Sequence, residues 1–273
     1  MNYSCPLCQQ PLQFGDNGYR CANRHHFDQA KEGYVNLLPV QQKSSKEPGD
    51  SKAMMLARRE FLHAGFYQCL SDAINAELLE VLSSKQSYRL LDLGCGEGYY
   101  TGRLSKAFEA AERQLQVEAI DISKSAIRFA AKRYPTVDFA VASAYQLPFA
   151  DQSFDAIVRC FAPSQHQELL RLLESGGQLL TVTPGEQHLF ELKSAIYPYP
   201  KPHQLPTTEL EGFSHRNRLR VSQTLTIESG AAITALLNMT PFAWRMSDTQ
   251  KAQLAAKPLA LSLDFCIDRF ERD

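Results

Sequence analysis

The residues in this sequence that could do chemistry fall into two groups, a cysteine and histidine cluster at the N-terminus and a glycine-rich turn further along. The cluster reads Cys5-Pro-Leu-Cys8, then twelve residues, then Cys21-Ala-Asn-Arg-His25-His26. Zinc takes four soft or borderline ligands in a tetrahedron, and two close pairs of such residues joined by a hairpin supply them without a large core. We therefore predict one structural zinc ion per chain, bound by Cys5, Cys8, Cys21 and His25.

Two alternatives bear on this cluster. His26 competes with His25 as the fourth ligand, and we favour His25 because a three-residue gap after Cys21 lets one turn present both side chains inward. The thiols could instead be ordinary reduced core residues. The first 40 residues, however, have too little apolar content to fold unaided, and a metal would supply the missing stability. Four protein ligands leave no open position, so we expect no catalysis at this ion.

The second group is a glycine-rich turn between a strand and a helix. Residues 89 to 101 read Arg-Leu-Leu-Asp-Leu-Gly-Cys-Gly-Glu-Gly-Tyr-Tyr-Thr, with an apolar strand pattern that ends at Leu93 and a helical pattern that begins near Tyr99. A strand, a tight turn and a helix form the first half of a βαβ unit. The glycines are two apart, whereas the dinucleotide fingerprint is G-x-G-x-x-G, which disfavours a nicotinamide or flavin cofactor.

The run Asp-x-Gly-x-Gly-x-Gly instead resembles motif I of the Rossmann-like S-adenosylmethionine-dependent methyltransferases. Gly94 and Gly96 let the backbone approach the methionine part of that cofactor, and Asp92 can accept a hydrogen bond from its ammonium group. Asp121 ends the next short strand pattern, about twenty residues on, where an acid can take both ribose hydroxyls. Its alternative role is to cap the helix predicted from Ser123 to Tyr134.

The elements around these groups alternate between strands and helices. We expect two helices within residues 51 to 82, broken near Gly65, and a helix over residues 168 to 174. Residues 138–149 resemble the third-strand segment of those methyltransferases. Further strands are expected over residues 153–159 and 177–183, with residues 219–227 and 259–270 as a final antiparallel pair. This order predicts an α/β fold, a Rossmann-like class I methyltransferase with a mostly parallel seven-stranded sheet and a small N-terminal zinc-binding domain. The predicted divisions are a zinc-binding domain over residues 1–40, a linker over 41–52 and a methyltransferase domain over 53–273.

Composition limits the classes of protein that remain. Of 273 residues, 44% are hydrophobic and 22% charged, close to globular averages. The net charge of -1 gives no global attraction to a polyanion, so any nucleic-acid binding must come from local patches. The seven cysteines are crowded at the N-terminus and scattered elsewhere, which argues against a disulfide framework. No apolar run reaches about 18 residues and no export signal is evident, so we expect a cytoplasmic protein that does not cross or bind a membrane.

Several segments together resemble one family nearly end to end, the bacterial large-subunit rRNA guanine N1-methyltransferases. Besides the zinc cluster and motif I, they are residues 30–39 (Ala-Lys-Glu-Gly-Tyr-Val-Asn-Leu-Leu-Pro), Gly49-Asp50-Ser51, Arg58-Arg59, residues 184–189 and residues 239–245. The resemblance implies transfer of a methyl group from S-adenosylmethionine to N1 of a guanine in a 23S rRNA hairpin loop, of the guanine 745 type in rRNA numbering. It leaves open whether the protein is a homodimer.

The same resemblance extends the cofactor site. It implies cofactor contacts from a tyrosine before motif I and a histidine after the fifth strand, which match Tyr67 and His188. Ser143 stands where many relatives carry an adenine-facing acid, so the adenine contact shifts to Ala144 or Leu147. The predicted cofactor-binding residues are Tyr67, Asp92, Gly94, Gly96, Glu97, Gly98, Tyr99, Asp121, Ser143, Ala144, Leu147 and His188.

The RNA substrate and the proton acceptor are less sharply defined by sequence. Basic side chains could contact phosphates, and an aromatic side chain could stack on the target base. The candidates are Arg20, Arg24, Lys31, Lys43, Lys46, Lys52, Arg58 and Arg59 for phosphates, and Tyr145, Phe161 and Trp244 for stacking. We name no catalytic base: Asp155 is expected to be held at a strand start, and His188 is only a candidate. Cys160 is expected to be a packing residue.

Two other functions compete with rRNA methylation. A small-molecule methyltransferase for quinone or biotin precursors shares the Leu147-Pro-Phe and Ser153-Phe-Asp patterns, but does not ordinarily carry a zinc cluster. A zinc-dependent RNA-binding protein with a vestigial, non-catalytic methyltransferase fold is the second. Intact Asp92, three glycines and Asp121 argue against it.

Overall fold

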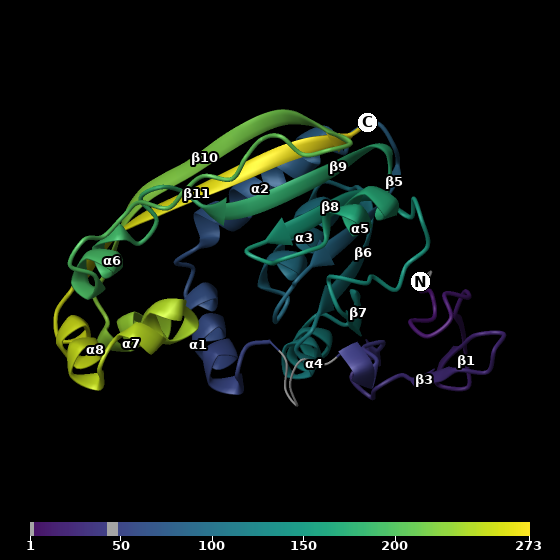
Figure 1. Ribbon diagram of the computed structural model, residues 1–273, viewed down its shortest axis with the longest axis horizontal. Helices are drawn as coiled ribbons and strands as arrows, with labels where there is room; N and C mark the ends of the chain where they lie inside the picture. The colour runs from purple at the N-terminus through teal and green to yellow at the C-terminus, as the bar shows by residue number, and fades with distance from the viewer. Residues whose placement is uncertain (1–2, 43–48) are drawn as a thin grey trace.

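One eight-stranded sheet organises the chain in this computed structural model, which describes residues 3–42 and 49–273, without the side chains of residues 243–244. The strand order is β10-β11-β9-β8-β5-β6-β7-β4 (Figure 1). The strands are β4 (Val35–Asn36), β5 (Ser87–Leu93), β6 (Gln114–Asp121), β7 (Asp138–Val141), β8 (Phe154–Cys160), β9 (Leu173–Pro184), β10 (Phe213–Ile227) and β11 (Leu259–Arg272). Only β11 runs antiparallel to its neighbours, β9 and β10. The predicted mostly parallel sheet of seven strands is confirmed, and β4 adds an eighth at the edge.

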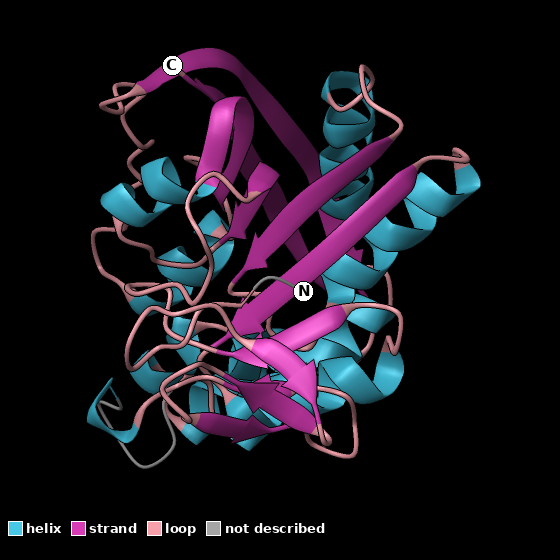
Figure 2. Cartoon of the chain, turned by 90° about the vertical axis from the view of Figure 1, so that its right-hand side faces the viewer, coloured by secondary structure: helices cyan, strands magenta, loops and turns pink. Residues whose placement is uncertain are grey.

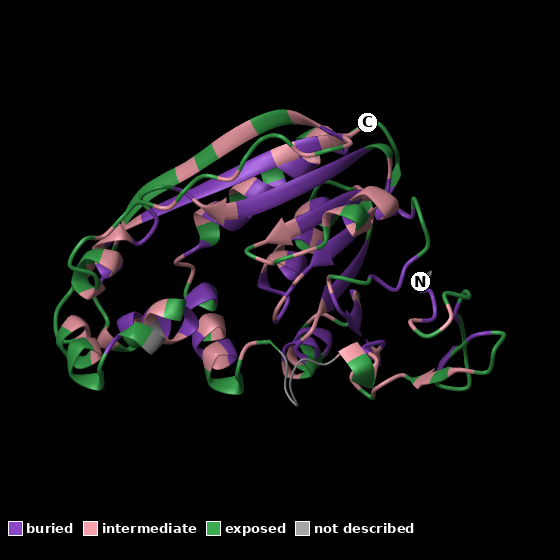
Figure 3. Ribbon diagram, in the orientation of Figure 1, coloured by how far each residue is buried: buried purple, intermediate pink, exposed green. Residues whose placement is uncertain are grey.

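The central strands are apolar because both faces of the sheet are covered. Along β5, Leu90 belongs to the core on one face and its neighbour Leu91 to the core on the other. Parallel strands buried on both sides therefore read as continuous apolar runs in sequence. Figure 2 shows helices on either side of the sheet, and Figure 3 shows the central strands buried while β10, at the edge, consists mostly of intermediate and exposed residues.

The helices beside the cofactor loop follow the predicted pattern. Helix α1 (Lys52–His63) is capped by the side chain of Ser51, and α2 (Gln68–Val81) follows a break at Gly65. Gly65 has a φ of +87°, a left-handed conformation that favours glycine. Helix α3 (Tyr99–Ala110) starts directly after the glycine turn, and α4 (Lys124–Arg133) is capped by Ser123. These four helices share the core on one face of the sheet.

The helix predicted over residues 168–174 is wrong in its bounds. Helix α5 runs from His166 to Leu172, and β9 begins at the next residue, Leu173. Both leucines are fully buried, and Leu173 already pairs with Phe154 at the start of β8. The pairing between β8 and β9 then shifts by an irregularity, so the strand starts earlier than its apolar pattern suggests.

The N-terminal region forms a small three-stranded sheet that packs on the face of the large sheet opposite α1 to α4. Its strands are β1 (Gln13–Gly15), β2 (Gly18–Arg20) and β3 (His26–Asp28). The predicted hairpin is present, with Phe14 opposite Tyr19 and both turn residues, Asp16 and Asn17, at positive φ. Strand β4 then pairs with β7, so residues 35–36 are part of the large sheet.

The C-terminal elements close one side of the molecule. Helices α7 (Gly230–Met239) and α8 (Asp248–Ala255), with the short helix η2 (Pro241–Arg245), are inserted between β10 and β11, and α6 (Phe190–Ile196) follows β9. Helix α7 packs against α1 (Figure 1). Within the described residues, no helix has the length and apolar character required to span a bilayer. The division at residues 40 and 52 stays a prediction, and Lys43 and Lys46 of that linker lie outside the described residues.

Candidate active site and metal centre

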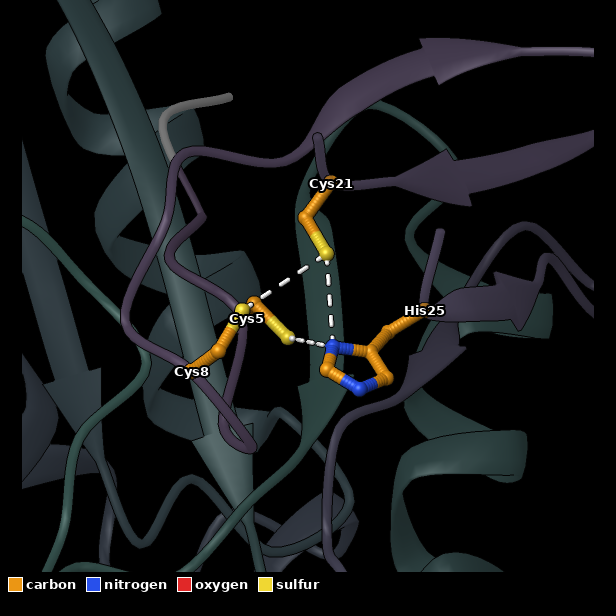
Figure 4. A group of neighbouring side chains, drawn as sticks. All are labelled: Cys5, Cys8, Cys21 and His25. Atoms are coloured by element: carbon orange, nitrogen blue, oxygen red, sulfur yellow. Dashed lines mark hydrogen bonds between the residues drawn. The ribbon is translucent and has the colours of Figure 1, made fainter. Parts of the chain in front are cut away.

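The four predicted zinc ligands meet at one point (Figure 4). Their ligand atoms all lie within 4.8 Å of one another. His25 Nδ1 is 3.5 Å from the sulfur of Cys5 and 3.4 Å from that of Cys21, and the sulfurs of Cys8 and Cys21 are 3.7 Å apart. In a tetrahedron with Zn–S bonds of about 2.3 Å and a Zn–N bond of about 2.05 Å, S···S edges are about 3.75 Å and S···N edges about 3.5 Å. These three distances therefore fit a structural zinc ion.

Local backbone geometry explains why His25 and not His26 completes the cluster. The Cys21 amide donates to the carbonyl of His25, and Arg24 between them adopts a positive φ of 65°. This tight turn brings the Cys21 and His25 side chains to the same side. His26 lies in β3, and its Nδ1 is 3.5 Å from a carboxylate oxygen of Asp28.

A cavity of about 1040 Å³ lies at the carboxyl edge of the sheet. Its wall is made by the turn after β5, the end of β6, the loops after β7, β8 and β9, and parts of α1, α7 and η2. Ligands of open α/β sheets bind at this edge. Nine of the predicted cofactor residues line it, namely Tyr67, Asp92, Gly94, Gly96, Glu97, Tyr99, Asp121, Ala144 and His188.

The remaining three predicted residues do not line this cavity. Gly98 caps α3 in a left-handed conformation with a φ of 81°. The Ser143 hydroxyl accepts a hydrogen bond from the Tyr145 amide, and Leu147 is buried in the core. Their predicted cofactor contacts therefore have no support from the cavity, while the adjacent Ala144 lies in its wall.

The absence of a side chain matters at two glycines of the turn, for a different reason at each. Gly94 has a φ of +78°, and a side-chain Cβ there would come within 2.3 Å of the Cβ of Ala162, in the loop after β8. Gly96 has a φ of +57° and nothing within 4 Å of a Cβ position. Gly94 thus permits two loops to touch, and Gly96 leaves bare backbone facing open space in the cavity wall, where a ligand can approach closely.

Two carboxylates flank the turn, the buried Asp92 and the half-buried Asp121. Asp92 is 4% exposed and accepts a hydrogen bond of 2.5 Å from the Thr101 hydroxyl; burial raises its pKa to about 6. Asp121 accepts from the amides of Gly96 (3.0 Å) and Ser123 (2.7 Å), and burial raises its pKa as well. Each oxygen of Asp121 uses one lone pair in these bonds, so both retain an acceptor site for hydroxyl groups.

Tyr67 and His188 form a buried pair in the cavity wall. The Tyr67 hydroxyl is 3.3 Å from His188 Nε2, and the Asp264 amide donates to His188 Nδ1 at 3.3 Å. Because Nδ1 is an acceptor, we assign the ring proton to Nε2, which donates to Tyr67. Burial lowers the pKa of His188 to about 3, so the ring is neutral. Neither nitrogen is then free to accept the proton of a substrate.

Sequence reasoning missed two polar groups, one that contacts a residue of the cavity wall and one in the wall itself. His63 at the end of α1 places Nε2 3.2 Å from the buried carboxylate of Glu97. Arg159, at the end of β8, lines the cavity. His63 is the last residue of α1, and Arg159 is one residue before the end of β8, the strand beside β5. Their position at the ends of elements near the glycine turn is the only signal in the sequence that could have identified them.

Asp155 is held at the start of β8 as predicted, by hydrogen bonds from the Arg89 amide and the Lys85 ammonium group. Cys160, expected to be a packing residue, is half-buried in the cavity wall. Two of the stacking candidates, Tyr145 and Phe161, also line the cavity and are 57% and 45% exposed. The third, Trp244, has its side chain outside the described residues.

Comparisons with known proteins agree with this architecture. Residues 3–46 match the family described as RlmA, N-terminal, a zinc ribbon, and residues 90–178 match the family described as methyltransferase domain. A crystal structure of a Bacillus halodurans protein assigned to the methyltransferases superposes with a TM-score of 0.51 at 16% identity, over 72% of this chain and 97% of that one. The fold and site thus define a class, the S-adenosylmethionine-dependent class I methyltransferases, here with an N-terminal zinc ribbon.

Two relatives narrow this class to a family. The 23S rRNA (guanine(748)-N(1))-methyltransferase of Streptomyces fradiae is 36% identical over 193 residues, which are 70% of this chain and 66% of that protein. A Bacillus subtilis protein, YxjB, whose name carries 23S rRNA (guanine-N1) methylation as a provisional assignment, is 32% identical over 251 residues, 89% of this chain and 86% of its own. The chain belongs to the 23S rRNA (guanine-N1)-methyltransferase family.

The cavity fits S-adenosylmethionine by its own chemistry. The backbone of Gly96 faces open space, which a side chain at this position would partly fill. The Asp92 and Asp121 carboxylates offer acceptors for an ammonium group and for ribose hydroxyls. When bound, the cofactor supplies an electrophilic methyl group on a sulfonium. The chain's part is to hold the cofactor and to position an acceptor nitrogen against that methyl group.

Removal of one zinc ligand should disorder the zinc ribbon and spare the cofactor site. We expect Cys21→Ala to lower the bound zinc from one ion per chain to near zero and to make residues 3–30 sensitive to protease, because the small sheet lacks a core of its own. Affinity for S-adenosylmethionine should change by less than about threefold. Zinc analysis, limited proteolysis and calorimetry measure these effects, with Cys69→Ala, a cysteine outside the cluster, as the control. Full zinc retention by Cys21→Ala would contradict the assignment.

Loss of the Asp121 carboxylate should weaken cofactor binding. Asp121→Ala removes charge-assisted hydrogen bonds to the ligand and to the Gly96 amide, so we expect binding of S-adenosylmethionine to weaken by roughly 1.5 to 3 kcal/mol. Isothermal titration calorimetry measures this change. Asp151→Ala, whose carboxylate is exposed and outside the cavity, is the matched control. Equal affinities for the two variants would exclude Asp121 from the cofactor site.

Glu97 should make the ligand-free protein less stable at alkaline pH. Burial raises the pKa of Glu97 from 4.5 to about 7, so the native state holds a proton that the unfolded state releases between these values. The contribution of protonated Glu97 to the free energy of unfolding is therefore fully present below about pH 4.5 and is lost as the pH rises through 7. At pH 8 we expect Glu97→Gln to be about 1 to 3 kcal/mol more stable than the wild type in urea unfolding, and equally stable at pH 4.5. Glu80→Gln, at an exposed position, should show no difference at either pH.

Proposed function

We propose that this protein transfers a methyl group from S-adenosylmethionine to N1 of a guanine in a hairpin loop of 23S rRNA. Family membership supports the reaction, and the cavity supports the cofactor. The relative from Streptomyces fradiae is named for guanine 748, and the target of this chain is proposed at guanine 745. An rRNA substrate makes the cytoplasm the proposed site of action.

The observation that carries this proposal is how the zinc ribbon attaches beside the cavity. The Ser4 amide donates to the Pro148 carbonyl at 2.8 Å, Tyr3 bridges to Phe149, and their rings lie 5.4 Å apart. Residues 148–149 closely follow the cavity-lining residues Ala144 and Tyr145. An acceptor large enough to reach both the ribbon and the cavity is a macromolecule, which favours RNA over a quinone or biotin precursor.

The ribbon offers cations for such a substrate. Arg20, Arg24 and Lys31 are exposed. Arg20 Nη1 lies 3.6 Å from Asp16 Oδ2, and the two side chains form a weak ion pair on the surface. Arg58 is paired with Asp50 in the cavity wall, and Arg59 packs over the ring of Phe129. Phosphate contacts from the three ribbon residues would position the RNA without reading its sequence.

Aromatic side chains at the cavity suit a base that has left its helix. Guanine N1 is engaged in Watson–Crick pairing within a duplex, so the target must be in a loop or be flipped out. Tyr145 and Phe161 are both exposed in the cavity wall and can stack on such a base. A hairpin loop presents an unpaired guanine without the cost of opening a duplex.

Methyl transfer to rRNA tests the proposal directly. Purified protein, labelled S-adenosylmethionine and 23S rRNA from cells that lack the modification should yield 1-methylguanosine after digestion, and mass mapping should place it at position 745 rather than 748. Asp121→Ala and rRNA that already carries the methyl group are the negative controls. Label found only in small molecules would support a metabolic methyltransferase, and cofactor binding without any transfer would support a non-catalytic RNA-binding protein.

A further inference from the structure

Arg159 places a positive charge in the cavity wall without a carboxylate partner among the described residues. It stands at the carboxyl end of β8, and its Nη1 donates to the Ser164 hydroxyl at 2.7 Å. The guanidinium is half-buried, and burial lowers its pKa. By contrast, Arg58 in the same cavity is paired with Asp50. A partly buried cation without an anion is costly, so a ligand that supplies acceptors would compensate it.

The loop that follows Arg159 lies against the cofactor turn. Ala162 occupies the space where a side chain of Gly94 would be, at a Cβ distance of 2.3 Å. Phe161, which precedes Ala162 in this loop, has a positive φ of 55°, and its amide donates to the Val182 carbonyl. Strained residues of this kind persist where the surrounding structure fixes them, often at functional sites. An acceptor base at this loop is therefore next to the methyl group of a cofactor bound to the turn.

We propose that Arg159 recognises the O6 and N7 edge of the target guanine; this inference rests on the proposed function. A guanidinium donates two parallel hydrogen bonds to guanine O6 and N7, whereas adenine presents an amino donor in place of O6. This contact leaves N1, on the adjoining edge, free to face the methyl group. Arg159 thus selects guanine and orients the nitrogen that reacts.

The same contact assists the chemistry at N1. As the base reacts, the N1 proton leaves to water, its bonding pair stays on N1 in the plane of the ring, and the π pair of N1 is delocalised onto O6, where negative charge develops. The in-plane pair on N1 forms the new bond to the methyl carbon, and the carbon–sulfur bond breaks with its electrons remaining on sulfur. A guanidinium beside O6 stabilises this charge without accepting a proton. This role is consistent with a His188 ring whose two nitrogens are both engaged.

The test compares guanine with 7-deazaguanine, which lacks the N7 acceptor, at the target position of a synthetic hairpin RNA. Wild-type protein should methylate the guanine hairpin at least about tenfold faster at limiting RNA than the 7-deazaguanine hairpin. Arg159→Lys and Arg159→Ala should be slower on guanine and should lose most of this preference. Their rates should also keep rising toward alkaline pH, where N1 ionises unaided. Arg103→Lys, whose guanidinium is bonded to Ser71 and Asp72 outside the cavity, should behave as wild type.

Binding measurements separate the other roles open to Arg159. Calorimetry should give the same affinity for S-adenosylmethionine in wild type and Arg159→Lys within about twofold, and thermal unfolding should confirm that both fold. Weaker cofactor binding would show that Arg159 contacts the cofactor. An equal loss on both hairpins would show a phosphate contact. Either result overturns the inference, as does a wild type that does not distinguish the two bases. Absence of transfer from wild type to the guanine hairpin and to 23S rRNA would instead refute the proposed function.

Discussion

The close contact between the glycine turn after β5 and the loop after β8 is the constraint on which the active site depends. Neighbouring parallel strands end at the same edge of the sheet, and Gly94 lets their two loops touch because it has no side chain to meet Ala162. The turn after β5 then presents bare backbone to the cavity, while the end of β8 presents Arg159 and the loop after it presents Phe161. On the proposed function, strand pairing thus places the methyl donor beside its acceptor.

The zinc ribbon extends this arrangement beyond the cavity. Three of the distances between its ligand atoms match the edges of a tetrahedron around zinc, and the Ser4 amide of the ribbon donates to the Pro148 carbonyl in the segment after β7. Metal binding therefore does more than fold a small sheet. The ribbon that it folds carries the exposed cations Arg20, Arg24 and Lys31, which we propose to contact the phosphates of the RNA.

Sequence patterns predicted those features that follow from short-range rules. The cysteine and histidine spacing identified the metal ligands, the continuous apolar runs identified the central strands, and the glycine turn followed by Asp121 identified the cofactor edge. Features that depend on distant parts of the chain were not predictable. Strand β4 has only two residues and exists because β7 offers a free edge. The contact between His63 and Glu97 joins α1 to the turn only once α1 packs over it.

The central claim is that a cofactor and a loop guanine meet where Gly94 and Ala162 touch. A crystal structure of the protein with S-adenosylhomocysteine and the target hairpin RNA measures this most directly. The account predicts the cofactor on the turn at Gly96 and Asp121, and an extruded guanine on Phe161 with N1 directed at the cofactor sulfur. A guanine bound elsewhere on the protein, or stacked within the RNA while the cofactor site is filled, would contradict it.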